Sequence, residues 1–169
     1  MLRLDIGSLP EGMTHTDLVA DTSEWGEVPD GGRLESPVRV SLEATRNGRD
    51  IFLKGQAVVT SVLECGRCLE KFVYQLEATI EVWVIVGGEP DSEERENVIE
   101  VPTGAGYADL TDHVRSELLL QVPLKQLCRA DCRGLCPVCG TNLNIASCDC
   151  RPESHDARWE VLKRLREKP

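Results

Sequence analysis

The chain has 169 residues, of which 41% are hydrophobic and 28% charged, which is the composition of a globular protein rather than a fibrous or disordered one. Its formal net charge of −10 argues against a simple nucleic-acid coat, and no apolar run approaches the ~20 residues of a membrane-spanning helix. The first residues lack the apolar core of a signal peptide, so we expect a cytoplasmic protein whose thiols stay reduced.

The charge is unevenly distributed along the chain. Residues 125–169 carry nine Lys and Arg against six Asp and Glu, whereas residues 1–124 carry ten against twenty-three. An acidic body with a basic, cysteine-rich tail could meet RNA at one end and a basic protein at the other. Ordinary solubility charge would give the same asymmetry, so the charge alone does not decide between them.

The N-terminal residues 1–35 form a segment that the sequence leaves poorly defined. Leu2, Leu4 and Ile6 alternate with polar residues and predict a short strand. Residues 20–36 have no sustained period and are expected to form a loop.

Residues 36–125 are predicted to form an antiparallel β core, in which three strands follow one another as a meander. Apolar residues alternate with polar ones through 38–44, 51–63 and 72–84, so each stretch has one buried face. Asn47-Gly48 stands between the first two stretches and is a strong hairpin signal.

Two helices are expected after this sheet. Residues 109–121 follow the 3–4 spacing of a helix, and Asp109 or Thr111 would cap its start. The stretch between sheet and helix, 87–100, contains six acidic residues and is expected to form an exposed loop that leads into a short strand, "NVIEV", at 97–101. Near the end of the chain, Asp156 is a plausible N-cap for a short helix with an apolar stripe. The fold class is therefore α+β, with residues 126–169 forming a cysteine-rich tail and a C-terminal helix.

The eight cysteines carry the strongest chemical pattern. In a reducing compartment, clustered thiols indicate metal sites or, less often, redox sites rather than four disulfides. Cys136 and Cys139, in "CPVCG", are typical of a metal knuckle. We expect Gly140 to let the backbone turn where a Cβ would clash. Cys148 and Cys150 are two residues apart, so an extended backbone directs both to the same side, and residues 141–147 can return them to the knuckle. These four thiols form the predicted site two.

A second, weaker knuckle contains Cys65 and Cys68 at the tip of a predicted hairpin, where Leu69 rather than glycine follows. Thioredoxin-type chemistry would place such a pair at a helix start, whereas here a strand follows. The remaining thiols, Cys128 and Cys132, are four residues apart and complete the predicted site one. Each closed Cys₄ shell suits a structural zinc ion, so we expect two zinc ions per chain.

No catalytic constellation is visible, and we expect no enzyme activity. His15, His113 and His155 have no motif around them, and phosphate-binding glycine loops and nucleophile elbows are absent. An iron–thiolate or thiol redox protein remains the alternative, because "CPVCG" also holds single iron ions. An RNA-processing enzyme is the weakest reading.

The assembled motifs resemble the YceD family over residues 36–166. They are "LECGRCLEKF" at 63–72, "VPLKQLC" at 122–128, "CRGLCPVCGTNLN" at 132–144 with "CDC" at 148–150, and "DARWEVLKRL" at 156–165. The resemblance implies a non-enzymatic ribosome-biogenesis factor that supports accumulation of large-subunit ribosomal RNA. It implies as partners that RNA or its precursor, a basic ribosomal protein, or both, and no membrane. The basic residues expected to contact phosphates or to offset the thiolate charge are Arg67, Lys125, Arg129, Arg133 and Arg151.

Overall fold

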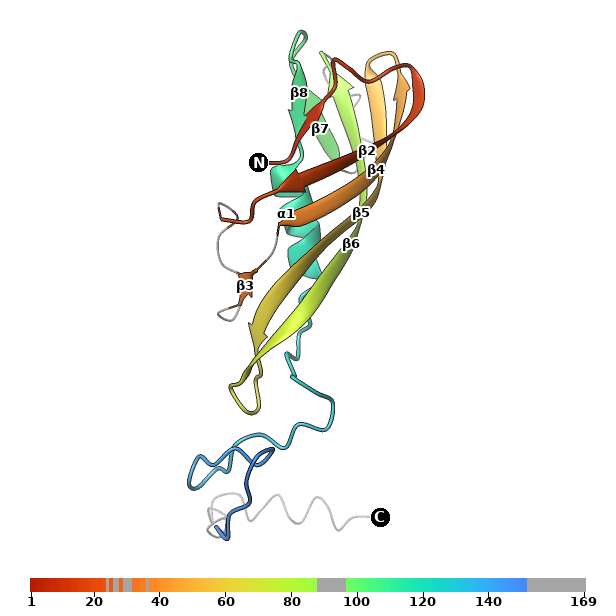
Figure 1. Cartoon of the computed structure of the whole chain (residues 1–169). Helices are drawn as coiled ribbons and strands as arrows, with labels where there is room; N and C mark the ends of the chain where they lie inside the picture. The colour runs from red at the N-terminus through yellow and green to blue at the C-terminus, as the bar shows by residue number, and fades with distance from the viewer. Residues whose placement is uncertain (24, 26–27, 29–31, 36, 88–96, 152–169) are drawn as a thin grey trace, which may run out of the picture.

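A long, curved β-sheet dominates the computed structural model, which describes residues 1–23, 25, 28, 32–35, 37–87 and 97–151 (Figure 1). Five strands follow one another across the sheet: β2 (Gly12–Ala20), β4 (Val38–Asn47), β5 (Asp50–Glu64), β6 (Lys71–Val86) and β7 (Val98–Val101). A sixth, the short β3 (Arg33–Leu34), pairs with β5 next to the start of β4. Two further strands, β1 (Arg3–Asp5) and β8 (Tyr107–Asp109), form a separate antiparallel pair.

The alternation read from the sequence is confirmed in β4, β5 and β6. Inward residues such as Leu53 and Ile80 are 0% exposed, whereas their neighbours Lys54 and Glu81 pair on the opposite face. The predicted hairpin at Asn47 is also confirmed, because Asn47 pairs with Asp50 and Gly48 has the positive φ of 62° that the turn requires. The period of two therefore determined which face of these strands is buried.

The β5–β6 hairpin is longer than the core that covers it. Its register runs from Asp50 opposite Ile85 to Glu64 opposite Lys71, and Figure 1 shows its tip extending beyond the rest of the sheet. Tyr74 lies on the same face as the buried Leu76 but is 38% exposed. The hairpin thus holds its tip away from the core, at the end where the cysteine-rich segment lies.

The three-stranded meander is confirmed, but the antiparallel arrangement expected over residues 36–125 is wrong for the last strand. β7 runs parallel to β6, with Trp83 opposite Val98 and Val86 opposite Val101. β7 starts opposite Trp83, three residues before the end of β6, and both strands then run in the same direction. The composition of residues 87–100 indicated a loop but contained no information about the direction of the strand that follows it.

The N-terminal segment contributes to the sheet and to the core. β2 pairs with β4 from Gly12 opposite Arg46 to Ala20 opposite Val38. Leu2, Leu4 and Ile6 are at most 3% exposed and belong to the main core. The short strand expected at Leu2–Ile6 is present as β1, and the divisions at residues 35 and 125 stay a prediction.

Helix α1 (Thr111–Leu120) lies against β5 and β6 and buries Val114 and Leu118. Its N-cap position is Leu110, so neither Asp109 nor Thr111 is the cap residue itself. Asp109 still accepts a hydrogen bond from the Thr111 backbone N–H, at 2.9 Å, while the Thr111 hydroxyl accepts one from Leu2 N–H at 2.8 Å. α1 is the one helix within the described ranges, and the helix expected after Asp156 lies outside them.

Candidate metal centre

The hairpin tip forms the first of two similar cysteine turns. Cys65 N–H donates to the carbonyl of Glu70, and Leu69 N–H donates back to the carbonyl of Cys65, both at 2.9 Å. The turn requires a left-handed residue at its end, and Leu69 adopts it with a φ of 61°. Leucine is strained in this conformation, which the sequence indicated only through the missing glycine.

The "CPVCG" turn repeats this bonding. Cys136 N–H donates to the carbonyl of Thr141 at 2.8 Å, and Gly140 N–H donates to the carbonyl of Cys136 at 2.9 Å. Gly140 has a φ of 73°, so it occupies the position of Leu69 in the first turn. The expected reason for this glycine needs correction. A Cβ there would meet nothing within 4 Å, so the glycine is required by its φ and not by a clash.

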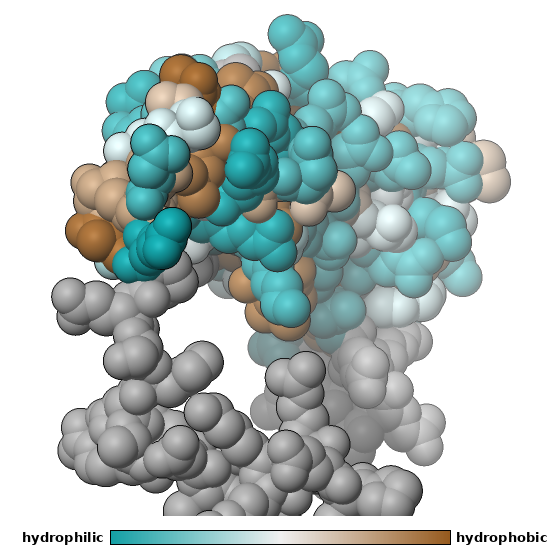
Figure 2. All heavy atoms as spheres, turned by 90° about the horizontal axis from the view of Figure 1, so that it is seen from below, coloured by the Kyte–Doolittle hydropathy of each residue, from teal (hydrophilic) through white to brown (hydrophobic). Residues whose placement is uncertain are grey.

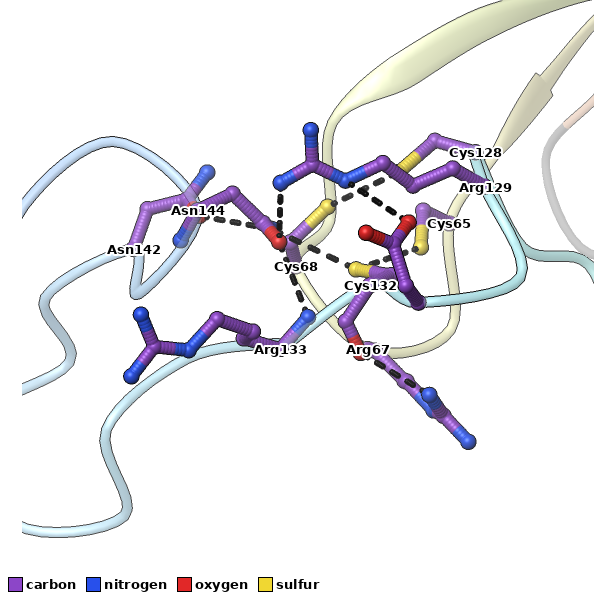
Figure 3. A network of polar contacts seen from close by, with 10 residues as sticks. Cys65, Arg67, Cys68, Cys128, Arg129, Cys132, Arg133, Asn142 and Asn144 are labelled. Carbon is purple, nitrogen blue, oxygen red and sulfur yellow. Dashed lines mark hydrogen bonds and ion pairs between the residues drawn. The ribbon is translucent and has the colours of Figure 1, made fainter.

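The chain after α1 brings two more thiols to the hairpin tip. Gly66 N–H donates to the carbonyl of Gln126 at 2.8 Å, which fixes this segment beside the tip. A single turn, closed by Cys132 N–H and the carbonyl of Arg129 at 3.1 Å, then directs Cys128 and Cys132 toward Cys65 and Cys68 (Figure 3). All four sulfur atoms lie within 4.8 Å of one another, in the grouping predicted as site one.

The dimensions of site one suit a tetrahedral metal ion. The Cys65 and Cys132 sulfurs are 3.8 Å apart, and those of Cys68 and Cys128 are 3.7 Å apart. A tetrahedral ion with metal–sulfur bonds of about 2.3 Å separates its ligands by about 3.8 Å. Three of the four cysteines are at most 4% exposed and form a small core of their own, against which Phe72, Leu127 and Leu135 pack.

Site two has the same four-sulfur composition in a more open setting. The sulfurs of Cys136, Cys139, Cys148 and Cys150 also lie within 4.8 Å of one another, and this grouping matches the predicted one. Cys139 and Cys150 are exposed, and Cys136 is buried. The Thr141 hydroxyl lies 3.1 Å from the Cys139 sulfur. Site two is therefore enclosed by its own short loop rather than by the sheet.

Each tetrad contains thiols whose pKa values are shifted in opposite directions. In site one, burial alone would raise the pKa of Cys65, but backbone N–H groups at Cys128, Cys68 and Arg67 lower it to about 6. Burial and the neighbouring thiols raise the pKa of Cys128 to about 12. In site two, hydrogen bonds from the Thr141 side chain and backbone lower the pKa of Cys139 to about 6. The nearby Cys139 thiol and burial raise the pKa of Cys150 to about 12. Four thiols this close cannot all ionise unless a cation compensates their charge.

Two asparagines between the sites were missed by the sequence reasoning. The Asn144 side-chain N–H donates to the Cys132 sulfur at 3.3 Å and to the Asn142 side-chain oxygen at 2.9 Å (Figure 3). The Asn144 oxygen accepts from the Arg129 guanidinium at 2.7 Å and from Arg133 N–H at 2.8 Å. The sequence indicated them only through the two amides in "TNLN", in a loop that was interpreted as a simple connection between the two halves of site two.

The five predicted basic contact residues are all exposed, but they differ in what they touch. Arg67 donates to the carbonyl of Cys132 at 2.8 Å, and Arg129 bonds Asn144 and lies 3.5 Å from Asp131. The Arg133 side chain points away from the sulfurs in Figure 3. Lys125 and Arg67 line a groove of about 450 Å³ between the hairpin tip and the segment after α1. Seen from below, this end of the molecule presents hydrophilic side chains beside a smaller gathering of apolar ones (Figure 2).

No helix in the described part of the chain combines the length and apolar character that crossing a bilayer needs. Within the described residues, the two cysteine tetrads are the groups that could hold a metal ion. Each tetrad consists of four thiols, so a tetrahedral ion held by all of them would have no ligand position left for water.

Comparison with known proteins places this arrangement in a family. Residues 53–166 match the family described as "Large ribosomal RNA subunit accumulation protein YceD". A chloroplast relative from Arabidopsis thaliana, named large ribosomal RNA subunit accumulation protein YCED homolog 1, is 26% identical over 174 residues, which cover 86% of this chain. The maize (Zea mays) homologue of the same name is 26% identical over 152 residues and 73% of this chain. This chain covers 52% of the length of each of these two relatives.

Bacterial relatives also match this chain. An uncharacterized protein of Mycobacterium tuberculosis is 30% identical over 139 residues, which cover 80% of this chain and 63% of the relative. No solved structure matches the chain significantly.

Proposed function

Because this chain belongs to the YceD family, we propose that it supports accumulation of large-subunit ribosomal RNA without being an enzyme, and that two zinc ions hold its cysteine-rich segment against the hairpin tip. The family name and the names of the chloroplast relatives supply the process. The observation that carries the molecular part is the pair of sulfur tetrads. A reducing compartment such as the cytoplasm keeps these thiols available to metal.

Zinc is the metal we assign to both tetrads. Four thiolates at tetrahedral spacing form a closed shell, which leaves no position for a reactive water and suits a structural role. Metal analysis of protein purified without strong chelator should give two zinc ions per chain. A value near zero in folded protein would refute the assignment, and a value near one would leave a single site. Iron–thiolate protein absorbs visible light and zinc protein is colourless, so colour tests the redox alternative.

We further propose that the basic residues around the tetrads contact ribosomal RNA, or its precursor, through phosphates. A bare zinc–thiolate shell carries a charge of −2, and Arg67 and Arg129 lie close enough to offset it through their bonds to Cys132 and Asn144. Lys125 and Arg133 are exposed and are the residues we assign to phosphates. The acidic body would then face a basic ribosomal protein.

A salt titration of binding to large-subunit RNA fragments tests this proposal. Lys125→Gln combined with Arg133→Gln should weaken binding and reduce the salt slope by up to about two units, because each lost phosphate contact releases about one counterion fewer. Arg39→Gln is the matched control, since Arg39 is exposed on the sheet, away from the cysteines. Equal effects of the control and the double variant, or absence of RNA binding by the wild type at low salt, would exclude the RNA contact. A ribosomal protein would then be the direct partner.

A further inference from the structure

Asn144 lies in the loop of site two but contacts a cysteine of site one. It lies in the loop of residues 141–147 that connects the two halves of site two. Its side-chain N–H nevertheless reaches the Cys132 sulfur of site one, at 3.3 Å (Figure 3). A residue that site two positions is therefore a hydrogen-bond donor to a ligand of site one.

The orientation of the Asn144 amide is determined by its other partners. Its oxygen accepts two hydrogen bonds, from the Arg129 guanidinium and from Arg133 N–H. An amide oxygen with two donors cannot exchange places with the nitrogen without losing both bonds, so the N–H₂ group must face the sulfur. The Asn142 side-chain oxygen accepts from both the backbone and the side-chain N–H of Asn144, at 3.0 and 2.9 Å, and completes the set.

The loop that carries Asn144 is itself anchored to the backbone between the two sites. Leu143 N–H donates to the carbonyl of Gly134 at 2.9 Å, and Asn142 forms a β-bridge with Leu135. Leu135 N–H in turn donates to the carbonyl of Arg67 at 3.0 Å, at the hairpin tip. A chain of backbone bonds thus runs from site two to the first cysteine turn, parallel to the side-chain bond from Asn144.

We infer that these contacts link the two tetrads into one metal centre, in which an ion at site two positions Asn144 against Cys132 and so strengthens metal binding at site one. This inference rests on the proposed metal sites. A metal-bound thiolate keeps negative charge, and an N–H donor beside it stabilises that charge. Such outer donors typically change metal affinity by about ten- to a hundredfold when removed. Since linkage is reciprocal, an ion at site one must strengthen site two by the same factor.

Cobalt(II) titration of the reduced, metal-free full chain measures this linkage, because thiolate–cobalt absorption reports each bound ion. Cys136→Ser with Cys139→Ser leaves only site one, and Cys65→Ser with Cys68→Ser leaves only site two. We expect site one to bind cobalt about tenfold more weakly when site two is deleted. Site two should weaken by the same factor when site one is deleted.

The Asn144 variants test the donor itself. Asn144→Asp keeps the shape and the oxygen that accepts from Arg129 and Arg133 N–H, but it replaces the donor by an oxygen that repels the Cys132 thiolate. We expect it to lower the cobalt affinity of site one at least as much as Asn144→Ala does. In either Asn144 variant, deletion of site two should then lower the site-one affinity by less than about a further twofold. Thiolate–cobalt spectra and the melting temperature of the sheet check that each variant is folded. If one of the two Asn144 variants misfolds, the other still provides the test.

Thr141→Val is the matched control, because the Thr141 hydroxyl lies 3.1 Å from a site-two sulfur, that of Cys139. It should lower the cobalt affinity of site two. Cobalt binding at site one should stay unchanged once both sites are saturated. Equal site-one affinity with and without site two would overturn the linkage while preserving the metal sites. Absence of cobalt binding at either tetrad would overturn the linkage and the proposed metal sites together.

Discussion

The sheet and the cysteine-rich segment are stabilised by different physical means. In β4, β5 and β6, the inward residues Val38, Leu53, Leu76 and Ile80 are 0% exposed, and each buried aliphatic side chain contributes about 1.5–3 kcal/mol. Residues 126–151 contain no helix and no strand beyond the isolated bridge of Leu135 and Asn142. Most of that segment is exposed or half-buried, so it has little apolar surface to bury and depends on sulfur, turns and amide contacts.

Because of this difference, the two regions are sensitive to different kinds of substitution. A sheet with a continuous core fails when a side chain no longer fits, whereas a segment without a core fails when a ligand or a turn residue is lost. Site one is where the two regions meet, since it joins the tip of the β5–β6 hairpin to Cys128 and Cys132 and has its own small apolar cluster.

The largest effect is expected from Gly55→Ala in the middle of β5. A Cβ at this position would lie 2.0 Å from the Ser41 carbonyl oxygen of the neighbouring strand, so β4 and β5 would have to separate. We expect a loss of about 3 kcal/mol in the free energy of unfolding, measured by urea denaturation. Unchanged stability would mean that β4 and β5 do not lie as close together at Gly55 as described. Gly106→Ala is the control for adding a methyl group, because its Cβ would meet nothing within 4 Å and its φ is not left-handed.

Loss of site one should cost more than loss of site two. Cys65→Ser removes a fully buried thiol from the site that joins residue 65 to residue 132. Because this site constrains a long loop, we expect the free energy of unfolding of the whole domain to fall by about 2 kcal/mol. Cys139→Ser removes an exposed thiol of a local loop and should loosen the tail while the sheet keeps its melting temperature. Thermal melting followed by far-UV circular dichroism compares the two, and equal losses would contradict the division into a joining site and a local site.

Gly134→Ala should separate the cysteine-rich segment from the hairpin tip. Gly134 has a φ of 75°, and a Cβ there would lie 3.0 Å from the Arg67 carbonyl oxygen. The left-handed backbone alone costs about 1–2 kcal/mol for an L-residue. Hydrogen exchange should show faster exchange at Leu135, whose N–H donates to that same carbonyl, with exchange in β5 unchanged. Unchanged exchange at Leu135 would show that the contact does not hold the segment.

The smallest effect distinguishes the two cysteine turns. Leu69→Gly should relieve the strained φ of 61° at a side chain that is 57% exposed and loses little burial. Because glycine also gains freedom in the unfolded chain, we expect a net gain of about 0.5 kcal/mol at most. The reverse change, Gly140→Leu, should destabilise site two. A loss of stability in Leu69→Gly would mean that the Leu69 side chain has a packing role.

Much of the fold could be predicted from the sequence alone. The alternation in residues 38–44, 51–63 and 72–84 predicted three strands and their buried faces, and Asn47-Gly48 predicted the turn between two of them. Both depend on local rules, since side chains of a strand alternate wherever it pairs and a tight turn requires a positive φ. Counting the thiols and their spacing also predicted the two groups of four that the structure brings together. That these groups hold zinc stays a proposal.

Other features were decided only by the tertiary structure. The place of β2 beside β4 and the parallel direction of β7 depend on how the chain crosses the sheet, and no local pattern encodes that path. The left-handed Leu69 follows from closing the turn that contains Cys65 and Cys68 rather than from any preference of leucine. The role of Asn144 arises because site two carries its loop to a sulfur twelve residues away. A side chain acquires a hydrogen-bond partner of this kind only when folding brings the two together.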